Sequence, residues 1–194
     1  RGRSATNMKE EDFVERLWIA NTHDTLLALT SAGRVLWLKV YQIPDAGPGA
    51  RGKPIVNLLP LEEGEAVQAI LPVRADSEGN VPDNRYVFFA TRMGTVKKTP
   101  LSDYSRPRSS GIRAIDIDDG DGLVDVSITD GARDIFLFAS NGKAVRFAED
   151  EVRPMGRTAH GVRGIRLTDK AHVVSMIVAD GEGDILTATQ RGYG

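Results

Sequence analysis

The sequence predicts an all-β protein built from repeats of about 50 residues, each with four short strands. Three kinds of short segment recur along the chain, and each keeps nearly the same distance to the others. Self-similarity at this period is typical of propellers and solenoids. Helical periodicity is nearly absent. The best helix candidate, EEDFVERLWIA, has β-rich counterparts in the other repeats, so we predict a strand there as well.

The first recurring segment is an apolar run that ends at a tight glycine turn and is followed by a second run. We interpret each pair of runs as a β-hairpin. The turn glycines are spaced by 61, 48 and 50 residues: Gly33, Gly94, Gly142 and Gly192. The long first spacing is explained by the insertion RADSEGNVPDNR at residues 74–85, which is polar and should form a surface loop.

The second recurring segment begins at another glycine, with spacings of 50, 59 and 50 residues: Gly2, Gly52, Gly111 and Gly161. Apolar residues stand four and six positions after the last three of these glycines, a period-two pattern that predicts a half-buried strand. They are Val56 and Leu58, Ile115 and Ile117, and Ile165 and Leu167. A third apolar run, predicted as a strand, closes each repeat: FVERLWIA, AVQAILPV, LVDVSITD and VVSMIVAD.

These registers divide a single domain over residues 1–194 into successive four-stranded units, or blades. Residues 1–25 would end one blade, and residues 184–194 would begin another. The fuller blades would be 26–73, 86–129 and 134–179. The chain starts without methionine and stops in a turn-like sequence, so we expect an excised fragment in which the array of blades is incomplete.

The net charge of -2 hides a segregation of charge along the chain. Residues 33–53, 91–113 and 140–166 have net charges of +3, +5 and +3. Acidic segments follow each of them: LEEGEAVQ, DIDDGDGLVD and the run from 169 to 184. Equivalent segments of a radial array occupy equivalent edges, so the basic segments should form a stripe around one rim. Such a stripe suits duplex DNA.

We predict that this stripe binds the phosphate backbone and does not read base sequence. Glycine beside arginine lets the backbone approach a phosphate while the guanidinium binds its oxygens. The candidate DNA-binding residues are Arg1, Arg3, Arg34, Arg51, Lys53, Arg92, Lys97, Lys98, Arg106, Arg108, Arg113, Lys143, Arg146, Arg153, Arg157, Arg163 and Arg191. In the alternative interpretation, these side chains lie on exposed strand faces and pair with the acidic segments.

The sequence contains no catalytic constellation. The histidines, His23, His160 and His172, are far apart and lack a ligand-spaced partner. DIDDGDG resembles a calcium loop, but Ile117 stands where the first aspartate belongs, so we predict a turn and no metal. No phosphate-binding glycine motif is present. We therefore expect a non-catalytic chain that binds no cofactor and no metal.

Cysteine is absent, which excludes disulfides and favours a reducing cytoplasm. No apolar run approaches the roughly 20 residues of a membrane helix, and the first residues lack the apolar core of a signal peptide. We expect a cytoplasmic location and no membrane partner.

Several long strings closely resemble the C-terminal domain of the bacterial DNA gyrase A subunit, which is part of a type IIA topoisomerase. They are EEDFVERLWIANTHD, VYQIPDAGPGARGKPIVNLLPLEEGE, GTVKKTPLSDYSRPRSSG, NGKAVRF, GVRGIRL and ILTATQRGYG. The resemblance covers nearly the whole chain. It implies a β-pinwheel, a propeller-like disc of four-stranded blades that wraps duplex DNA around its basic rim. The family also has a basic box, Q-R-R-G-G-K-G, of which Arg1 and Gly2 match the last two positions, with arginine in place of lysine.

The resemblance also implies partners. Wrapping would support the ATP-dependent introduction of negative supercoils by the whole gyrase, with ATP and Mg²⁺ used elsewhere in that enzyme. The partners would be duplex DNA, the remainder of the gyrase A polypeptide, and the gyrase B polypeptide, in a heterotetramer with two copies of each. The family's active-site tyrosine lies in another region, and no tyrosine of this chain matches it.

Two alternatives remain open. The corresponding domain of topoisomerase IV shares the fold but typically lacks the basic box, and the strings GARGKPIVNLLPLE and TATQRGYG favour gyrase over it. An alternative of another class is a non-catalytic scaffold that binds an acidic protein through the same rim.

Overall fold

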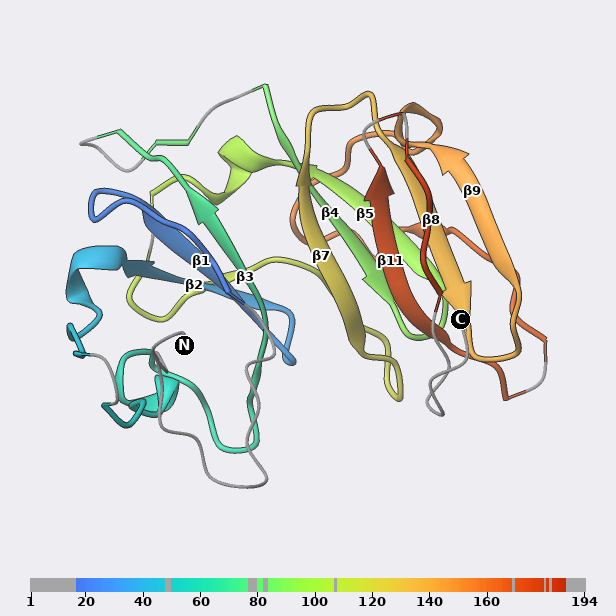
Figure 1. The fold of residues 1–194 in the computed structure, drawn as a ribbon. Coiled ribbons are helices and arrows are strands. Elements are labelled where there is room, and N and C mark those ends of the chain that lie inside the picture. Colours follow the sequence, from blue (N-terminus) through green and yellow to red (C-terminus); the bar gives the residue numbers. More distant parts are fainter. Residues whose placement is uncertain are drawn as a thin grey trace, which may run out of the picture.

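The computed structural model describes residues 17–47, 50–76, 80–81, 84–106, 108–168, 170–179, 181 and 183–187. These residues form three antiparallel sheets, which stand side by side from left to right in Figure 1. The described part of the chain contains no helix that is long and apolar enough to cross a membrane.

Each sheet is built around one hairpin and the apolar run that closes the same repeat. The first has the order β3-β1-β2-β6 and contains β1 (Thr25–Thr30), β2 (Arg34–Lys39), β3 (Val67–Val73) and β6 (Ile112–Arg113). The second has the order β10-β5-β4-β7 and contains β4 (Tyr86–Thr91), β5 (Thr95–Pro100), β7 (Leu123–Thr129) and β10 (Val162–Arg163). The third has the order β11-β8-β9 and contains β8 (Asp134–Ala139), β9 (Ala144–Ala148) and β11 (Val173–Ala179). Short 3-10 turns follow or precede these strands: Val40–Gln42, Ile55–Asn57, Leu101–Tyr104 and Glu149–Glu151.

The strands owe their stability to burial between neighbouring sheets. Every residue of β1 is buried, as expected for an apolar strand covered on both faces. One core joins the first two sheets through Leu27, Leu71 and Phe89. A second core joins the second and third sheets through Phe88 and Leu137. Because adjacent residues of β4 point in opposite directions, Phe88 and Phe89 serve different cores.

The second and third repeats each contribute a short strand to the sheet before them, and we call it the exchanged strand. β6 follows β5 in the sequence but pairs with β2 of the first sheet, and β10 follows β9 but pairs with β5 of the second sheet. The carbonyl of each preceding turn glycine accepts a backbone hydrogen bond just after the exchanged strand. The Ala114 amide donates to Gly33 at 2.7 Å, and the Gly164 amide donates to Gly94 at 2.8 Å. We call each exchanged strand, with the residues up to the next long strand, an arm (residues 112–122 and 162–172).

The turn glycines are required by this docking. Gly94 has φ +88°, and a Cβ there would lie 2.8 Å from Ile165 Cγ2. Gly33 has φ +73°, and a Cβ there would lie 2.5 Å from the Ile115 carbonyl oxygen. A side chain at either position would therefore be strained by the backbone and would displace the arm.

The hairpins and the third apolar runs are confirmed where the structure describes them, as β3, β7 and β11. The predicted strands after the second set of glycines are wrong in extent. Val56 lies in a 3-10 turn and is 59% exposed. Ile115 and Ile165 follow two-residue strands and pack against the turn glycines outside any strand. Their period-two pattern reflects extended arms, whose apolar side chains face the neighbouring hairpin.

Two further expectations fall partly outside the described residues. Most of EEDFVERLWIA does so, and its described part, residues 17–20, is in no strand. The insertion at 74–85 is described except at 77–79 and 82–83, and it is not wholly superficial, because Val81 is buried in the first core. The division into blades stays a prediction.

Candidate nucleic-acid interface

Lys97 does not face outward as the sequence predicted. It is fully buried, and its ammonium donates hydrogen bonds to the Ala114 carbonyl at 2.8 Å and to the Arg157 carbonyl. It also lies 5.7 Å from the centroid of the Phe89 ring. Burial lowers the pKa of Lys97 to about 8. This lysine ties β5 to the first arm and to a loop of the third repeat, so its inclusion among outward-facing DNA contacts is corrected.

Lys98 is also turned inward, although its neighbour points the other way. It is 4% exposed, donates to the Glu149 carbonyl at 2.9 Å and lies 5.0 Å from the centroid of the Tyr86 ring. The Glu149 carboxylate is equally buried and accepts from the Thr129 hydroxyl and from the Gly131 amide at 3.1 Å. Both charges are therefore satisfied inside the protein, and Lys98 is corrected for the same reason as Lys97.

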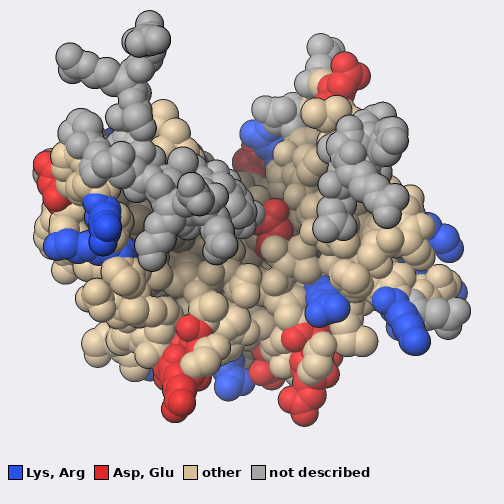
Figure 2. Space-filling view, turned by 60° about the horizontal axis from the view of Figure 1, so that its bottom comes forward, with Lys and Arg blue, Asp and Glu red and all other residues tan. Residues whose placement is uncertain are grey.

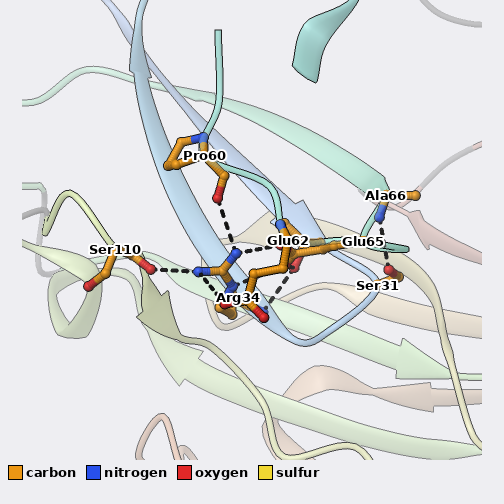
Figure 3. A network of polar contacts seen from close by, with 8 residues as sticks. Ser31, Arg34, Pro60, Glu62, Glu65, Ala66 and Ser110 are labelled. Carbon is orange, nitrogen blue, oxygen red and sulfur yellow. Dashed lines mark hydrogen bonds and ion pairs between the residues drawn. The ribbon is translucent and has the colours of Figure 1, made fainter. Parts of the chain in front are cut away.

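Arg34 is the third predicted DNA-binding residue whose charge is satisfied within the protein, and Figure 3 shows its contacts. Its guanidinium pairs with Glu65 and donates to the carbonyls of Ser110 at 2.7 Å and Pro60 at 3.2 Å. The Glu65 side chain is 2% exposed. The hydrogen bond from Arg34 lowers the pKa of Glu65 to about 2. Arg34 therefore connects β2 with the segment before β3 and with the loop before β6, and its charge is already neutralised.

Two predicted residues are exposed but have a carboxylate partner. Arg113 is 61% exposed, and its guanidinium lies 3.0 Å from Asp116. Arg146 is 62% exposed, pairs with Asp134 and lies 5.4 Å from the centroid of the Phe136 ring. Exposed pairs of this kind contribute about 0 to 1 kcal/mol, so a phosphate could compete for either arginine.

The remaining predicted residues in the described part of the chain form no ion pair with another described residue. Arg157 is half-buried, and the others are exposed: Arg51, Lys53, Arg92, Arg106, Arg108, Lys143, Arg153 and Arg163. Arg1, Arg3 and Arg191 lie outside the described residues. Most of the unpaired cations stand in turns and loops between strands, where phosphate could approach them.

Two further exposed cations lie close to the predicted ones in the structure, although they were not predicted from the sequence. Arg166 and Lys170 lie on the second arm, near Arg163 and across from Arg92 of the β4–β5 turn. Arg166 stands five residues after Gly161, whereas the arginine of this segment that was predicted to bind DNA, Arg163, stands two residues after it. Lys170 falls inside a run that is acidic in composition. Their position in the repeat, and not the charge of the surrounding sequence, could have been used to predict them.

On one face of the molecule (Figure 2), the described basic side chains are interrupted by acidic ones. Figure 2 brings the lower side of Figure 1 forward, and on this face Lys and Arg form separate patches with Asp and Glu between them. Asp116 and Asp118 of the first arm lie close to a histidine of the next repeat. The His160 ring is 3.4 Å from Asp116 and 3.2 Å from Asp118. Within the described ranges, no group of three or more acidic or histidine side chains is arranged to hold a metal ion.

Sheets that are joined by short strands from the next repeat along one chain define a propeller-like β-array. The family model described as "DNA gyrase C-terminal domain, beta-propeller" matches residues 24–74, 85–130 and 133–180. The chain belongs to this family of DNA gyrase C-terminal domains. The predicted fold class, an all-β pinwheel, is thereby confirmed, as is the resemblance to the gyrase A polypeptide.

Curated relatives agree with this assignment. The DNA gyrase A polypeptide of Salmonella typhimurium (strain LT2) is 58% identical over 194 residues, and that of Escherichia coli (strain K12) is 54% identical over 194 residues. Each alignment covers 100% of this chain and 22% of the relative. The chain therefore spans about a fifth of the length of these relatives.

Solved structures share the fold. The C-terminal domain of DNA topoisomerase IV matches with a TM-score of 0.77 at 34% identity, covering 90% of this chain and 53% of that one. The C-terminal domain of DNA gyrase A matches with a TM-score of 0.66 at 22% identity, covering 83% and 50%, which shows the fold alone. The family model and the sequence relatives place this chain with gyrase, and topoisomerase IV remains the alternative.

Proposed function

We propose that this chain binds duplex DNA along its exposed, unpaired cations and wraps it as the C-terminal domain of the DNA gyrase A polypeptide. In the whole enzyme, wrapping would support the ATP-dependent introduction of negative supercoils. ATP and Mg²⁺ would be used by other parts of that enzyme, and the chain itself performs no chemistry. The partners are the remainder of the gyrase A polypeptide and the gyrase B polypeptide, in a heterotetramer with two copies of each, in the cytoplasm.

The observation that carries this proposal is the set of exposed cations that have no acidic partner in the described residues. Three cations of the original set are satisfied internally, by carbonyls for Lys97 and Lys98 and by a carboxylate for Arg34. The exposed cations without an acidic partner among the described residues occur in each of the described repeats, among them Arg51, Arg106 and Arg153. Cations spread over successive repeats can contact phosphates along an arc, and these contacts would offset the energy of bending the duplex.

A binding titration with duplexes of increasing length tests the proposal. A duplex of about one helical turn, about 10 bp, can reach only a small part of the array, whereas one of several turns can reach more than one repeat. We expect the longer duplex to bind more tightly and to have a steeper loss of affinity with salt, because each phosphate contact adds about 0.9 to the slope of log K against log salt.

Equal affinity and equal salt slope for short and long duplexes would contradict wrapping. Absence of duplex binding, with binding to an acidic protein domain instead, would favour the scaffold alternative. A single-stranded DNA of matched length serves as the control, because it has the same backbone charge per strand but lacks the stiff rod that wrapping requires.

A further inference from the structure

A surface hollow of about 710 Å³ lies where the second arm docks on the second sheet. Arg92 lines it from the β4–β5 turn, and Arg163, Arg166 and Lys170 line it from the arm that leads to the third sheet. All four side chains are exposed, and none pairs with an acid elsewhere in the described structure. The hollow therefore holds four unneutralised charges drawn from two repeats.

Backbone contacts fix the walls of the hollow. The Gly94 carbonyl accepts from the Gly164 amide at 2.8 Å, which places the arm against the turn. The Met93 amide donates to the Asp121 carboxylate at 2.9 Å, and the Arg92 amide donates to the Gly122 carbonyl at 2.7 Å, so the turn is held from its other side as well. The Asp121 carboxylate is directed at backbone amides, those of Met93 and Gly122. The cations thus project from segments that are anchored at both ends.

The equivalent position between the first and second sheets lacks three of these four cations. The Gly33 turn receives the first arm as the Gly94 turn receives the second. Ser31 stands there in place of Arg92, Asp116 in place of Arg166, and Gly120 in place of Lys170. The arginine that both arms share has different surroundings, because Arg113 pairs with Asp116 at 3.0 Å. The repeat geometry is the same at both junctions, and only the second presents free positive charge among the described residues.

The lining favours a polyanion. Small-molecule sites are lined mainly by apolar and aromatic side chains with a few polar groups, whereas four cations line this hollow. Duplex DNA carries one negative charge per about 1.7 Å of its axis, so one stretch of backbone can meet several of these cations at once. Arginine can also hold two phosphate oxygens through its planar fork.

We propose that this hollow seats the phosphate backbone of the duplex where it passes from the second sheet to the third, with Arg166 and Lys170 as contacts that add to Arg92 and Arg163. This inference rests on the proposed function. It adds that the two junctions between the sheets bind the duplex with unequal strength. The duplex is held more tightly at the second junction than at the first, where Arg113 is paired with Asp116.

The test compares two double variants of the full chain that lose the same charge. Arg166→Gln with Lys170→Gln removes two cations from the hollow. Arg74→Gln with Arg85→Gln removes two exposed cations that lie outside it. We expect the hollow variant to lose affinity for a long duplex and its salt slope to fall by about 2, about 1 for each cation. The control should keep the wild-type slope, and equal slopes for the two variants would overturn the inference.

Failure of this inference can be told apart from failure of the proposed function. If the wild-type chain shows no salt-dependent duplex binding, the proposed function fails. The melting temperature measured with inorganic pyrophosphate then decides about the hollow. A rise for the wild type that the hollow variant lacks would support an anion site at Arg166 and Lys170, and equal shifts for both proteins would overturn it. Melting without ligand confirms that both variants are folded.

Discussion

At the scale of single residues, burial decides which cations can bind DNA. Lys97 and Lys98 are adjacent in β5, yet both are buried, because sheets pack against both faces of that strand. Their ammonium groups are stabilised by backbone carbonyls, among them those of Arg157 and Glu149 in the next repeat. Arg34 is removed from the surface by Glu65. Breaking such a pair from one side costs about 3 to 5 kcal/mol when the remaining charge is buried, so Arg34 contributes to the fold and not to the DNA surface.

The buried Lys97 predicts how stability changes with pH. Its folded pKa, about 8, lies below the ordinary lysine pKa of 10.5 that applies to the unfolded chain. The unfolded chain therefore holds the proton more tightly between these values, and the folded state should gain stability as the pH rises. Relative to Lys97→Met, the wild type should gain about 2 kcal/mol in unfolding free energy between pH 7 and about 9.5.

Urea denaturation of both proteins at several pH values measures this gain. Burial also raises the pKa of Tyr104, whose ionisation in the unfolded chain acts in the opposite sense, but Tyr104 is present in both proteins. Other titrating groups are common to both proteins and cancel in the difference. Parallel stability curves for the wild type and Lys97→Met would contradict a buried, easily deprotonated lysine.

At the scale of elements, the exchanged arms connect the sheets. Each arm contributes only a two-residue strand, Ile112–Arg113 or Val162–Arg163, and its next residues pack against the turn glycine of the preceding hairpin. Gly142 is the corresponding turn glycine of the third sheet, and a Cβ there would meet nothing within 4 Å among the described residues. The turns are otherwise alike, since Gly94 has φ +88° and Gly142 has φ +80°. They form a matched pair for measuring what arm docking contributes.

Gly94→Ala should destabilise the protein more than Gly142→Ala. Both substitutions place a side chain in the left-handed region, at about 1 to 2 kcal/mol. Only the alanine at position 94 also meets the arm, and overpacking of this kind adds about 1 to 3 kcal/mol. The difference in urea midpoint at constant m-value gives the contribution of the contact. Equal losses of stability would mean that the arm does not press on the turn.

The sequence was sufficient for the long elements and insufficient for the arms. The runs that became β1, β4, β7 and β11 are apolar enough to be recognised as strands without a structure. A two-residue strand has no periodicity, so nothing local indicates that Ile112 pairs with Val35 of another repeat. For the same reason, the sequence alone does not show that the four cations of the hollow lie together. Arg92 and Lys170 meet only because the arm crosses from one sheet to the next.

At the scale of the whole molecule, the sequence predicts an even basic stripe, whereas acidic side chains separate the basic ones on the face that Figure 2 shows. Smooth bending of 20 to 30 bp costs on the order of 1 to 6 kcal/mol, because the persistence length is about 150 bp. Phosphate contacts must offset that cost wherever the duplex curves. The free charges at Arg163 and Arg166 can do so, whereas Arg113 at the equivalent place is paired with Asp116. Bending should therefore be concentrated between the second and third sheets.

The most direct test of wrapping is a measurement of linking number. Relaxed circular DNA is incubated with increasing amounts of the chain, torsional strain is released by a relaxing topoisomerase, and the topoisomers are resolved after the protein is removed. Wrapping predicts a shift of linking number that grows with protein concentration and saturates with duplex binding. Saturated binding with an unchanged linking number would contradict wrapping, because DNA would then be bound by the exposed cations without being curved around them.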